Sequence, residues 1–212
     1  MTGDKIDPIK PPLLETSLGD YLEAVSSSAP TPGGGSVAAV VAALSAALGS
    51  MVAAISAKQS QDDGIATLAA SCSRFRKAFL RQSAEDQTAF DAVMRALKLP
   101  KDDPARPDQV EATVQAAAQA PLAVAQSCVD LLSDLESLGT VASRHCISDI
   151  GAAAHLSLAA LRSSLLNVYI NIMFMRDEKV ARACETAASQ LDQEATDRWQ
   201  HIVDHVIGRI RG

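Results

Sequence analysis

The chain has 212 residues, 48% hydrophobic content and a formal net charge of −6. This length and apolar content are enough for one compact domain with a sizeable core. The acidic balance and the lack of a basic run argue against a nucleic-acid partner, which needs a concentrated cationic surface. The four cysteines are widely spaced, without a C-x-x-C pair, and no signal peptide is recognisable, so we expect reduced thiols in a cytoplasmic protein.

The first helix is expected to begin after Ser17. Residues 1–16 contain three prolines and are predicted to form a flexible N-terminal arm, followed by one helical domain over residues 17–212. Ser17 and Asp20 have the spacing of a capping box, with Asp in place of the usual Glu or Gln. A short helix is therefore predicted to start here.

Residues 28–36 read Ser-Ala-Pro-Thr-Pro-Gly-Gly-Gly-Ser and lead directly into a long helix. The prolines fix φ, while three consecutive glycines let a ligand or another helix approach the backbone with no Cβ in the way. Ser36 is predicted to be the N-cap of that helix. The unpaired amides of its first turn suit an anion or a polar heterocycle. The alternative is a tight turn against a closely packed helix.

Residues 37–57 contain no charged side chain. The run is long enough to cross a bilayer, but it is mostly Ala, Ser, Gly and Val and lacks aromatic belts, so we do not expect a membrane span. Small residues recur at helical spacing in Ala38, Ala42 and Ala46, and larger ones fill space elsewhere, namely Val37, Val41, Leu44, Leu48 and Ile55. An apolar helix of this kind belongs at the centre of a bundle or a dimer.

The rest of the chain shows helical periodicity throughout. Helices are predicted over about 68–97, 110–135, 150–175 and 180–210, with Pro121 inside the second of these and a solvated loop at 101–108. No segment shows a sustained strand alternation. The fold class is therefore predicted to be all-α, a single-domain bundle with long central Ala-rich helices. The apolar surface of these helices exceeds what one thin layer can cover, which predicts a symmetric helical homodimer.

Asp86 lies on the apolar face of its predicted helix, in register with Phe79, Ser83 and Phe90. A carboxylate in such a place must be paired, hydrogen-bonded or raised in pKa, and a raised pKa makes an acid/base usable near neutrality. The alternative is a structural Asp that caps a neighbouring helix or pairs with an arginine. Lys101 follows Leu99-Pro100 and either reaches back toward Asp86 or a substrate carboxylate, or is an ordinary exposed lysine.

Three other polar groups need interpretation. Asn167 and Asn171 share one helix face in apolar surroundings and either satisfy a helix end or offer paired donors and acceptors to a heterocycle. Asp149 stands where a helix begins and reads first as a cap. The His201, Asp204 and His205 group has spacing that could bind a metal, but it lacks a third strong ligand, so no metal is expected.

Several motifs follow one another along the chain in a recognisable order. They are Pro30 to Ser36, an Ala-rich helix with Met51-Val52, Glu85-Asp86 with Ala89-Phe90, Leu99-Pro100-Lys101, Pro121-Leu122, Ser148-Asp149, and Asn167-Val168 with Asn171. This order resembles the cyclodeaminase/cyclohydrolase family, from about Leu18 to Asp177. Two places depart from the pattern of that family: residues 57–61 lack a lysine cluster ending in tyrosine, and Gly139-Thr140 replaces a Gly-Asn pair.

The resemblance implies a folate one-carbon enzyme without a metal or redox cofactor. It implies Asp86 as the catalytic acid/base and Lys101 as its electrostatic partner. The implied substrate contacts are Pro32, Gly33, Gly34, Gly35, Ser36, Lys58, Asp149, Asn167 and Asn171. Because the chain has no room for a formiminotransferase domain, methenyltetrahydrofolate cyclohydrolase is the expected activity, with formiminotetrahydrofolate cyclodeaminase as the alternative. A non-catalytic folate-binding helical dimer is the alternative of another class, favoured by the departure at 57–61.

Overall fold

The computed structural model describes residues 15–58 and 63–212, which form helices joined by short turns and contain no strand. The helices are α1 (Leu18–Ser26), α2 (Gly34–Ala57), α3 (Asp63–Leu97), α4 (Arg106–Val141), α5 (Ile147–Ile172) and α6 (Glu178–Arg211). This arrangement confirms the predicted all-α class. Most of the predicted arm, residues 1–14, lies outside the described residues.

Of the two helix starts predicted from capping residues, one is confirmed and the other is wrong. Ser17 caps α1 as predicted, since its Oγ accepts a hydrogen bond of 3.1 Å from the backbone N–H of Asp20. The predicted N-cap at Ser36 is wrong: Gly33 is the N-cap of α2, and it makes no side-chain cap bond. The Ser36 hydroxyl instead bonds to other helices, so the helix begins three residues earlier and includes Gly34 and Gly35.

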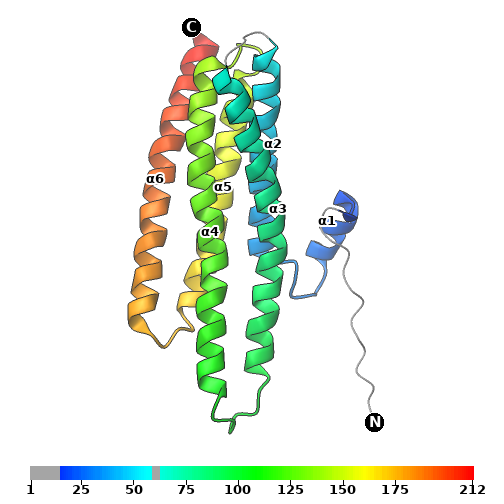
Figure 1. Cartoon of the computed structure of the whole chain (residues 1–212), viewed down its shortest axis with the longest axis vertical. Helices are drawn as coiled ribbons and strands as arrows, with labels where there is room; N and C mark the ends of the chain where they lie inside the picture. The colour runs from blue at the N-terminus through cyan, green and yellow to red at the C-terminus, as the bar shows by residue number, and fades with distance from the viewer. Residues whose placement is uncertain (1–14, 59–62) are drawn as a thin grey trace.

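Helices α2 to α6 form an elongated antiparallel bundle, and α1 stands beside it (Figure 1). The small-residue face of α2 lies inside the bundle, where Ala38, Ala42 and Ala46 are buried. Their size lets α5 come close enough for the Ser45 Oγ to donate to the Ala153 carbonyl at 2.7 Å. By length and composition α2 could cross a membrane, but half of its apolar window is buried against its neighbours. These contacts fit the core helix expected from the sequence.

α6 closes the bundle against α4 and α5. Its buried residues recur at helical spacing: Cys184, Ala188, Ala195, Ile202 and Val206. The prediction of a dimer rested partly on this helix, yet its apolar stripe is covered within the chain. Ile207 and Ile210 near its C-terminal end stay exposed, so only part of its apolar surface is covered.

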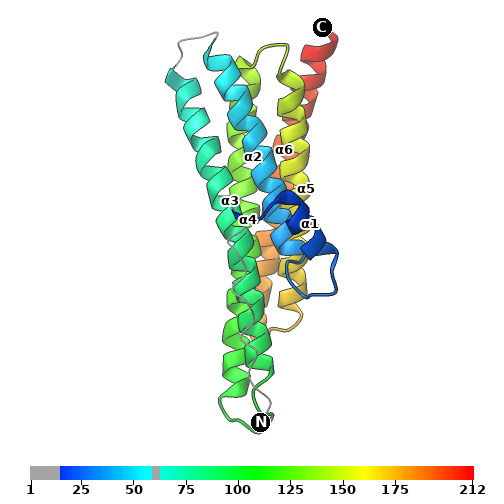
Figure 2. The ribbon, with the colours of Figure 1, turned by 90° about the vertical axis from the view of Figure 1, so that its right-hand side faces the viewer.

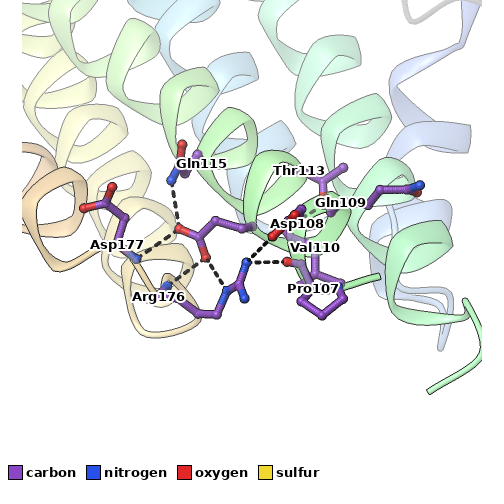
Figure 3. Close-up of polar contacts among 9 residues, drawn as sticks. Pro107, Asp108, Gln109, Val110, Thr113, Gln115, Arg176 and Asp177 are labelled. Carbon is purple, nitrogen blue, oxygen red and sulfur yellow. Dashed lines mark hydrogen bonds and ion pairs between the residues drawn. The ribbon is translucent and has the colours of Figure 1, made fainter. Parts of the chain in front are cut away.

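The turn between α5 and α6 is fastened to the start of α4 by the carboxylate of Glu111 (Figure 3). This carboxylate accepts hydrogen bonds from the backbone N–H groups of Arg176 (2.8 Å) and Asp177 (3.1 Å) and from Gln115 (2.8 Å). The Arg176 guanidinium also donates to the Pro107 carbonyl at 2.8 Å. These donors, with the Arg176 N–H first among them, hold the pKa of Glu111 below its ordinary value.

α4 runs without interruption through Pro121, which has no N–H to offer the carbonyl one turn earlier. That carbonyl belongs to Ala117, and it accepts a hydrogen bond of 3.1 Å from the side-chain amide of Asn171 on α5. A side chain of the neighbouring helix therefore satisfies the acceptor that the proline leaves free.

Candidate active site

The carboxyl group of Asp86 on α3 lies against the first turn of α2. It accepts a hydrogen bond from the backbone N–H of Ser36, one of the amides that a helix N-terminus leaves without an intrahelical partner. The close approach requires glycine, because a Cβ on Gly35 would stand only 2.6 Å from Cγ of Asp86. The glycine run thus admits another group to bare backbone, as predicted, and that group is the protein's own carboxyl.

Two opposing effects set the acidity of Asp86. Burial is the larger and raises its pKa above the ordinary value of 3.8, while the Ser36 N–H lowers it. No cationic side chain among the described residues contributes. The net result is a carboxyl that holds its proton to higher pH than an exposed Asp, the property expected of a general acid/base.

Beneath this carboxyl runs a buried line of three hydroxyl groups from three helices. The Ser36 Oγ lies 2.7 Å from the Ser83 Oγ of α3 and 3.1 Å from the Tyr21 hydroxyl of α1. Burial raises the pKa of Tyr21, and the negative charge of Asp86 adds to the increase. Ser36 is completely buried, so its hydroxyl is placed to position the first turn of α2 rather than to contact a ligand.

The sequence places Ser83 on the same helix face as Asp86 but does not indicate that its hydroxyl bonds to Ser36, and it indicates no role for Tyr21. The available sequence signal for Ser83 was its position three residues before Asp86, because residues at this spacing are neighbours on a helix surface. No local pattern marks Tyr21, because its partner lies fifteen residues away on another helix.

The glycine loop offers only part of its backbone to solvent. Gly34 is exposed and Gly33 is half-buried, whereas Pro32 and Gly35 are buried. Asn167 of α5 stands beside Gly34, with its Nδ2 placed 3.7 Å from where a Cβ of that glycine would be. The surface that a ligand can reach near Asp86 is therefore formed by Gly33, Gly34 and Asn167.

The two asparagines have different partners. Asn167 donates to the carbonyl of Ser163 in its own helix at 2.9 Å, and its amide oxygen, next to the loop, has no hydrogen-bond partner among residues 15–58 and 63–212. The Asn171 amide donates to the Ala117 carbonyl at 3.1 Å and to the Asn167 carbonyl at 2.8 Å. Asn171 therefore has a structural role, but its acceptors lie inside α4 and α5 and not at the helix end that was one of the two predicted alternatives.

Three other predicted residues lie away from Asp86 within this chain. Lys101 is exposed in the turn between α3 and α4, which extends beyond the start of α2 (Figure 2). Lys58 is exposed at the opposite end of α2, about 36 Å from Gly34 at 1.5 Å per residue. Asp149 lies in the first turn of α5, level with the C-terminal half of α2. The predicted cap at Asp149 is wrong, because Cys146 is the N-cap of α5 and no side-chain cap bond is made there.

The histidines of α6 have other partners. The Nε2 atom of His205 lies 3.1 Å from the Gly139 carbonyl, and His201 lies 3.9 Å from the Glu136 carboxylate. Over residues 15–58 and 63–212, no three His, Cys, Asp or Glu side chains gather in a way that could hold a metal ion.

Comparison with known proteins finds a family and relatives whose names agree with one another. The model of the formiminotransferase-cyclodeaminase family matches residues 17–190. A methenyltetrahydrofolate cyclohydrolase of Methylorubrum extorquens is 33% identical over 169 residues, covering 76% of this chain and 81% of that protein. The formimidoyltransferase-cyclodeaminase of Mus musculus is 34% identical over 194 residues, which cover 86% of this chain but 35% of the mouse protein.

A solved structure agrees with the fold. The crystal structure of formiminotetrahydrofolate cyclodeaminase from Thermotoga maritima matches with a TM-score of 0.79 and 26% identity, over 92% of this chain and 98% of the other. The helical bundle holds a half-buried carboxyl of raised pKa against a helix N-terminus, an arrangement suited to acid–base chemistry. The chain belongs to the formiminotransferase-cyclodeaminase family, whose matched members are named as enzymes of folate metabolism.

Proposed function

We propose that this protein is a methenyltetrahydrofolate cyclohydrolase, which adds water to the bridge between N5 and N10 and yields 10-formyltetrahydrofolate. The observation that carries the proposal is the Asp86 carboxyl, raised in pKa and held against the bare first turn of α2. The relative from Methylorubrum extorquens supports the same activity, since the match covers most of both chains.

The reaction requires one group that moves protons. Water attacks the bridging carbon, loses a proton to the Asp86 carboxylate and forms a tetrahedral carbon. The bond from that carbon to N5 then breaks, N5 takes the proton from Asp86, and the hydroxyl of the tetrahedral carbon releases its own proton to solvent as the formyl C=O forms. The same carboxyl therefore serves as base and then as acid. Its raised pKa makes the carboxylate a better proton acceptor than that of an exposed Asp and keeps the acid form populated to higher pH.

Other residues would bind the substrate around this centre. Gly33 and Gly34 present backbone to the ligand, and Asn167 presents its amide oxygen beside them. Lys101 is proposed as an electrostatic partner, which requires its turn to approach the bound folate. The chemistry as proposed needs no metal or redox cofactor, because only protons and water are transferred.

Formiminotetrahydrofolate cyclodeaminase is the second candidate activity. The similarity to the Thermotoga maritima enzyme of that name favours it, and its reaction passes through a tetrahedral carbon of the same kind. A folate-binding protein without activity is the third candidate, favoured by Ala57 to Gln61, where the expected lysine–tyrosine cluster is missing. We also propose that the protein is a cytoplasmic homodimer.

One pair of assays separates these candidates. Methenyltetrahydrofolate absorbs in the ultraviolet and loses this absorbance on hydrolysis, so fading beyond the rate of the buffer indicates a cyclohydrolase. Ammonia release from formiminotetrahydrofolate indicates a cyclodeaminase. Tight folate binding with neither reaction would contradict both enzymatic proposals and support the binding protein.

A further inference from the structure

Tyr21 anchors α1 to the rest of the bundle. α1 stands beside the N-terminal half of α2 (Figures 1 and 2). Tyr21 is 7% exposed and is the one buried residue of this helix, while both leucines of the helix are exposed. The side chains of Asp20 and Ser26 bond within α1 and its cap. The Tyr21 hydroxyl instead reaches another helix, where it lies 3.1 Å from the Ser36 Oγ.

The Ser36 hydroxyl is a junction with no bonding capacity left. Besides Tyr21, it lies 2.7 Å from the Ser83 Oγ and accepts a hydrogen bond of 3.5 Å from the side-chain amide of Gln87. A serine hydroxyl donates one hydrogen bond and accepts two. These three partners therefore use the whole capacity of Ser36, which is completely buried. Loss of any one of them would leave a buried polar group without a partner, which favours a rearrangement.

Ser36 also joins α2 to Asp86. Its backbone N–H donates to the Asp86 carboxyl, and its side chain bonds Ser83, which lies one turn earlier on the same helix. Two bonds thus fasten one residue of α2 to α3, one through the backbone and one through the side chain. The orientation of Ser36 sets how well its N–H meets the carboxyl, and the hydroxyl groups of Ser83 and Tyr21 hold that orientation.

The bond between Tyr21 and Ser36 also closes the segment that carries the glycine loop. The two residues are fifteen apart in sequence, and Gly33 and Gly34 lie between them. These glycines present the backbone that a ligand can reach near Asp86. Tyr21 is therefore placed to hold both the loop and the carboxyl while it contacts no ligand itself.

We infer that Tyr21 is a positioning residue: from α1, its hydroxyl holds Ser36 in the orientation that bonds the Asp86 carboxyl, and so keeps that carboxyl in place for proton transfer. The inference rests on the proposed function, because the position of Asp86 matters to the reaction only where Asp86 moves protons. It gives α1 a role in the site.

Within residues 15–58 and 63–212, no other charged side chain acts on this pair of groups. Burial and the Ser36 N–H act on Asp86, and Asp86 is the charged group that acts on Tyr21. A change in the pKa of Asp86 on loss of the Tyr21 hydroxyl therefore reports the Ser36 bond. The remaining charges are exposed or distant: Glu85 of α3 and Asp20 and Glu23 of α1 are exposed, α2 has none, α4 has none between Glu111 and Asp130, and α5 has none between Arg162 and Arg176.

Tyr21→Phe tests the inference, because it removes the hydroxyl and keeps the ring. Ser36 should then turn, and its N–H should bond Asp86 less well. That bond lowers the pKa of Asp86, so the pKa should rise, by about 0.3–1 pH unit for one modest hydrogen bond. The acidic limb of the pH profile of kcat/KM should move up by the same amount, and kcat should fall by about 10-fold, because a small misplacement of a reacting group is costly. A role in packing alone would lower the melting temperature and leave the midpoint of the limb unchanged.

Tyr169→Phe is the matched control, since the chain has two tyrosines and this one is 37% exposed on α5. It lies two residues from Asn167 and therefore on the opposite side of that helix. This variant should keep the midpoint and kcat of the wild type.

Ser36→Ala tests the route from Tyr21 to the carboxyl. It keeps the backbone N–H that Asp86 accepts but removes the junction, so it should raise the midpoint as Tyr21→Phe does. The double variant Tyr21→Phe, Ser36→Ala should raise it no further, because both changes break the same connection. Additive shifts would show that Tyr21 acts by another route and would overturn the inference.

NMR titration of the side-chain carboxyl groups measures the same midpoint without turnover. The Asp86 signal is the one that disappears in Asp86→Asn. An unchanged Asp86 midpoint in a folded Tyr21→Phe, or an equal rise in Tyr169→Phe, would rule out the positioning role. If Tyr21→Phe does not fold, Ser36→Ala decides by the same criterion. A protein that turns over neither folate, but whose Asp86 midpoint rises in Tyr21→Phe, would contradict the proposed function and leave the hold of Tyr21 on the carboxyl intact.

Discussion

Replacement of Asp86 by asparagine separates a catalytic carboxyl from a structural one. The side chain keeps its size, and its remaining oxygen can still accept the hydrogen bond from the Ser36 N–H. The change removes the titratable proton and little else. If Asp86 moves protons, kcat for hydrolysis of methenyltetrahydrofolate should fall by about 100-fold or more, the usual range for loss of a general acid/base.

The stability of this variant should change in the opposite direction to its activity. Because burial raises the pKa of Asp86, the folded state binds its proton more tightly than the unfolded state does. The resulting stabilisation is complete below the ordinary value of 3.8 and is lost as the pH rises through the folded pKa. Above that pH the wild type bears the cost of a buried charge that asparagine lacks. The melting temperature of Asp86→Asn, relative to wild type, should therefore rise with pH.

Thermal denaturation from pH 4 to 9 and steady-state kinetics on the same preparations measure both effects. Glu85→Gln is the matched control, since Glu85 is exposed one residue away and should tolerate the change in both measurements. A pH–rate profile should lose its acidic limb in Asp86→Asn. Near-wild-type turnover on both folates, in a variant that unfolds at lower temperature, would refute the reasoning and make Asp86 a structural cap of α2.

Three further changes test the glycine run and two contacts between helices. Gly35→Ala should lose activity and about 1–3 kcal/mol of stability, because its Cβ would displace the carboxyl it faces, whereas Gly34→Ala should be tolerated. Glu111→Gln should lower the melting temperature at pH 7. Because the Glu111 pKa is lowered, the difference from wild type should close as the pH falls below 4.5. A difference that stays constant with pH would contradict a stabilising role of the Glu111 carboxylate. Asn171→Ala should lower the free energy of unfolding, measured with denaturant, by about 1–3 kcal/mol. The loss should be smaller in a Pro121→Ala background, where the backbone N–H of residue 121 can bond the Ala117 carbonyl. Additive losses would contradict this coupling.

The helices were predictable because their signals are local. Apolar periodicity placed five long helices within a few residues of where the structure has them, and the spacing of Ser17 and Asp20 gave the start of α1. The register of Asp86 with apolar residues was also a local signal, while its catalytic role was predicted only with the help of the family resemblance. These features depend on residues within one or two turns of each other.

Features that depend on distant partners were missed or misassigned. Ser36 resembles an N-cap in sequence, but its hydroxyl bonds to Ser83 and Tyr21 from two other helices. Pro121 gives no indication in sequence that Asn171 will bond the Ala117 carbonyl that the proline leaves free, 54 residues away from Asn171. Such pairings follow from how the helices pack, which periodicity alone does not determine.

The glycines and the carboxyl act on one another in a way that bears on the chemistry. A helix N-terminus attracts an anion, and here the anion is Asp86 itself, so the Ser36 N–H stabilises the ionised form that burial disfavours. Burial has the larger effect while no cation lies close. The methenyl bridge of the proposed substrate carries a positive charge, and its arrival next to Asp86 would lower the pKa of the carboxyl. The base would then form when the substrate binds, and the carboxyl would hold the water proton once the neutral tetrahedral carbon has replaced the cation, until N5 takes it, which matches the order of the two proton transfers.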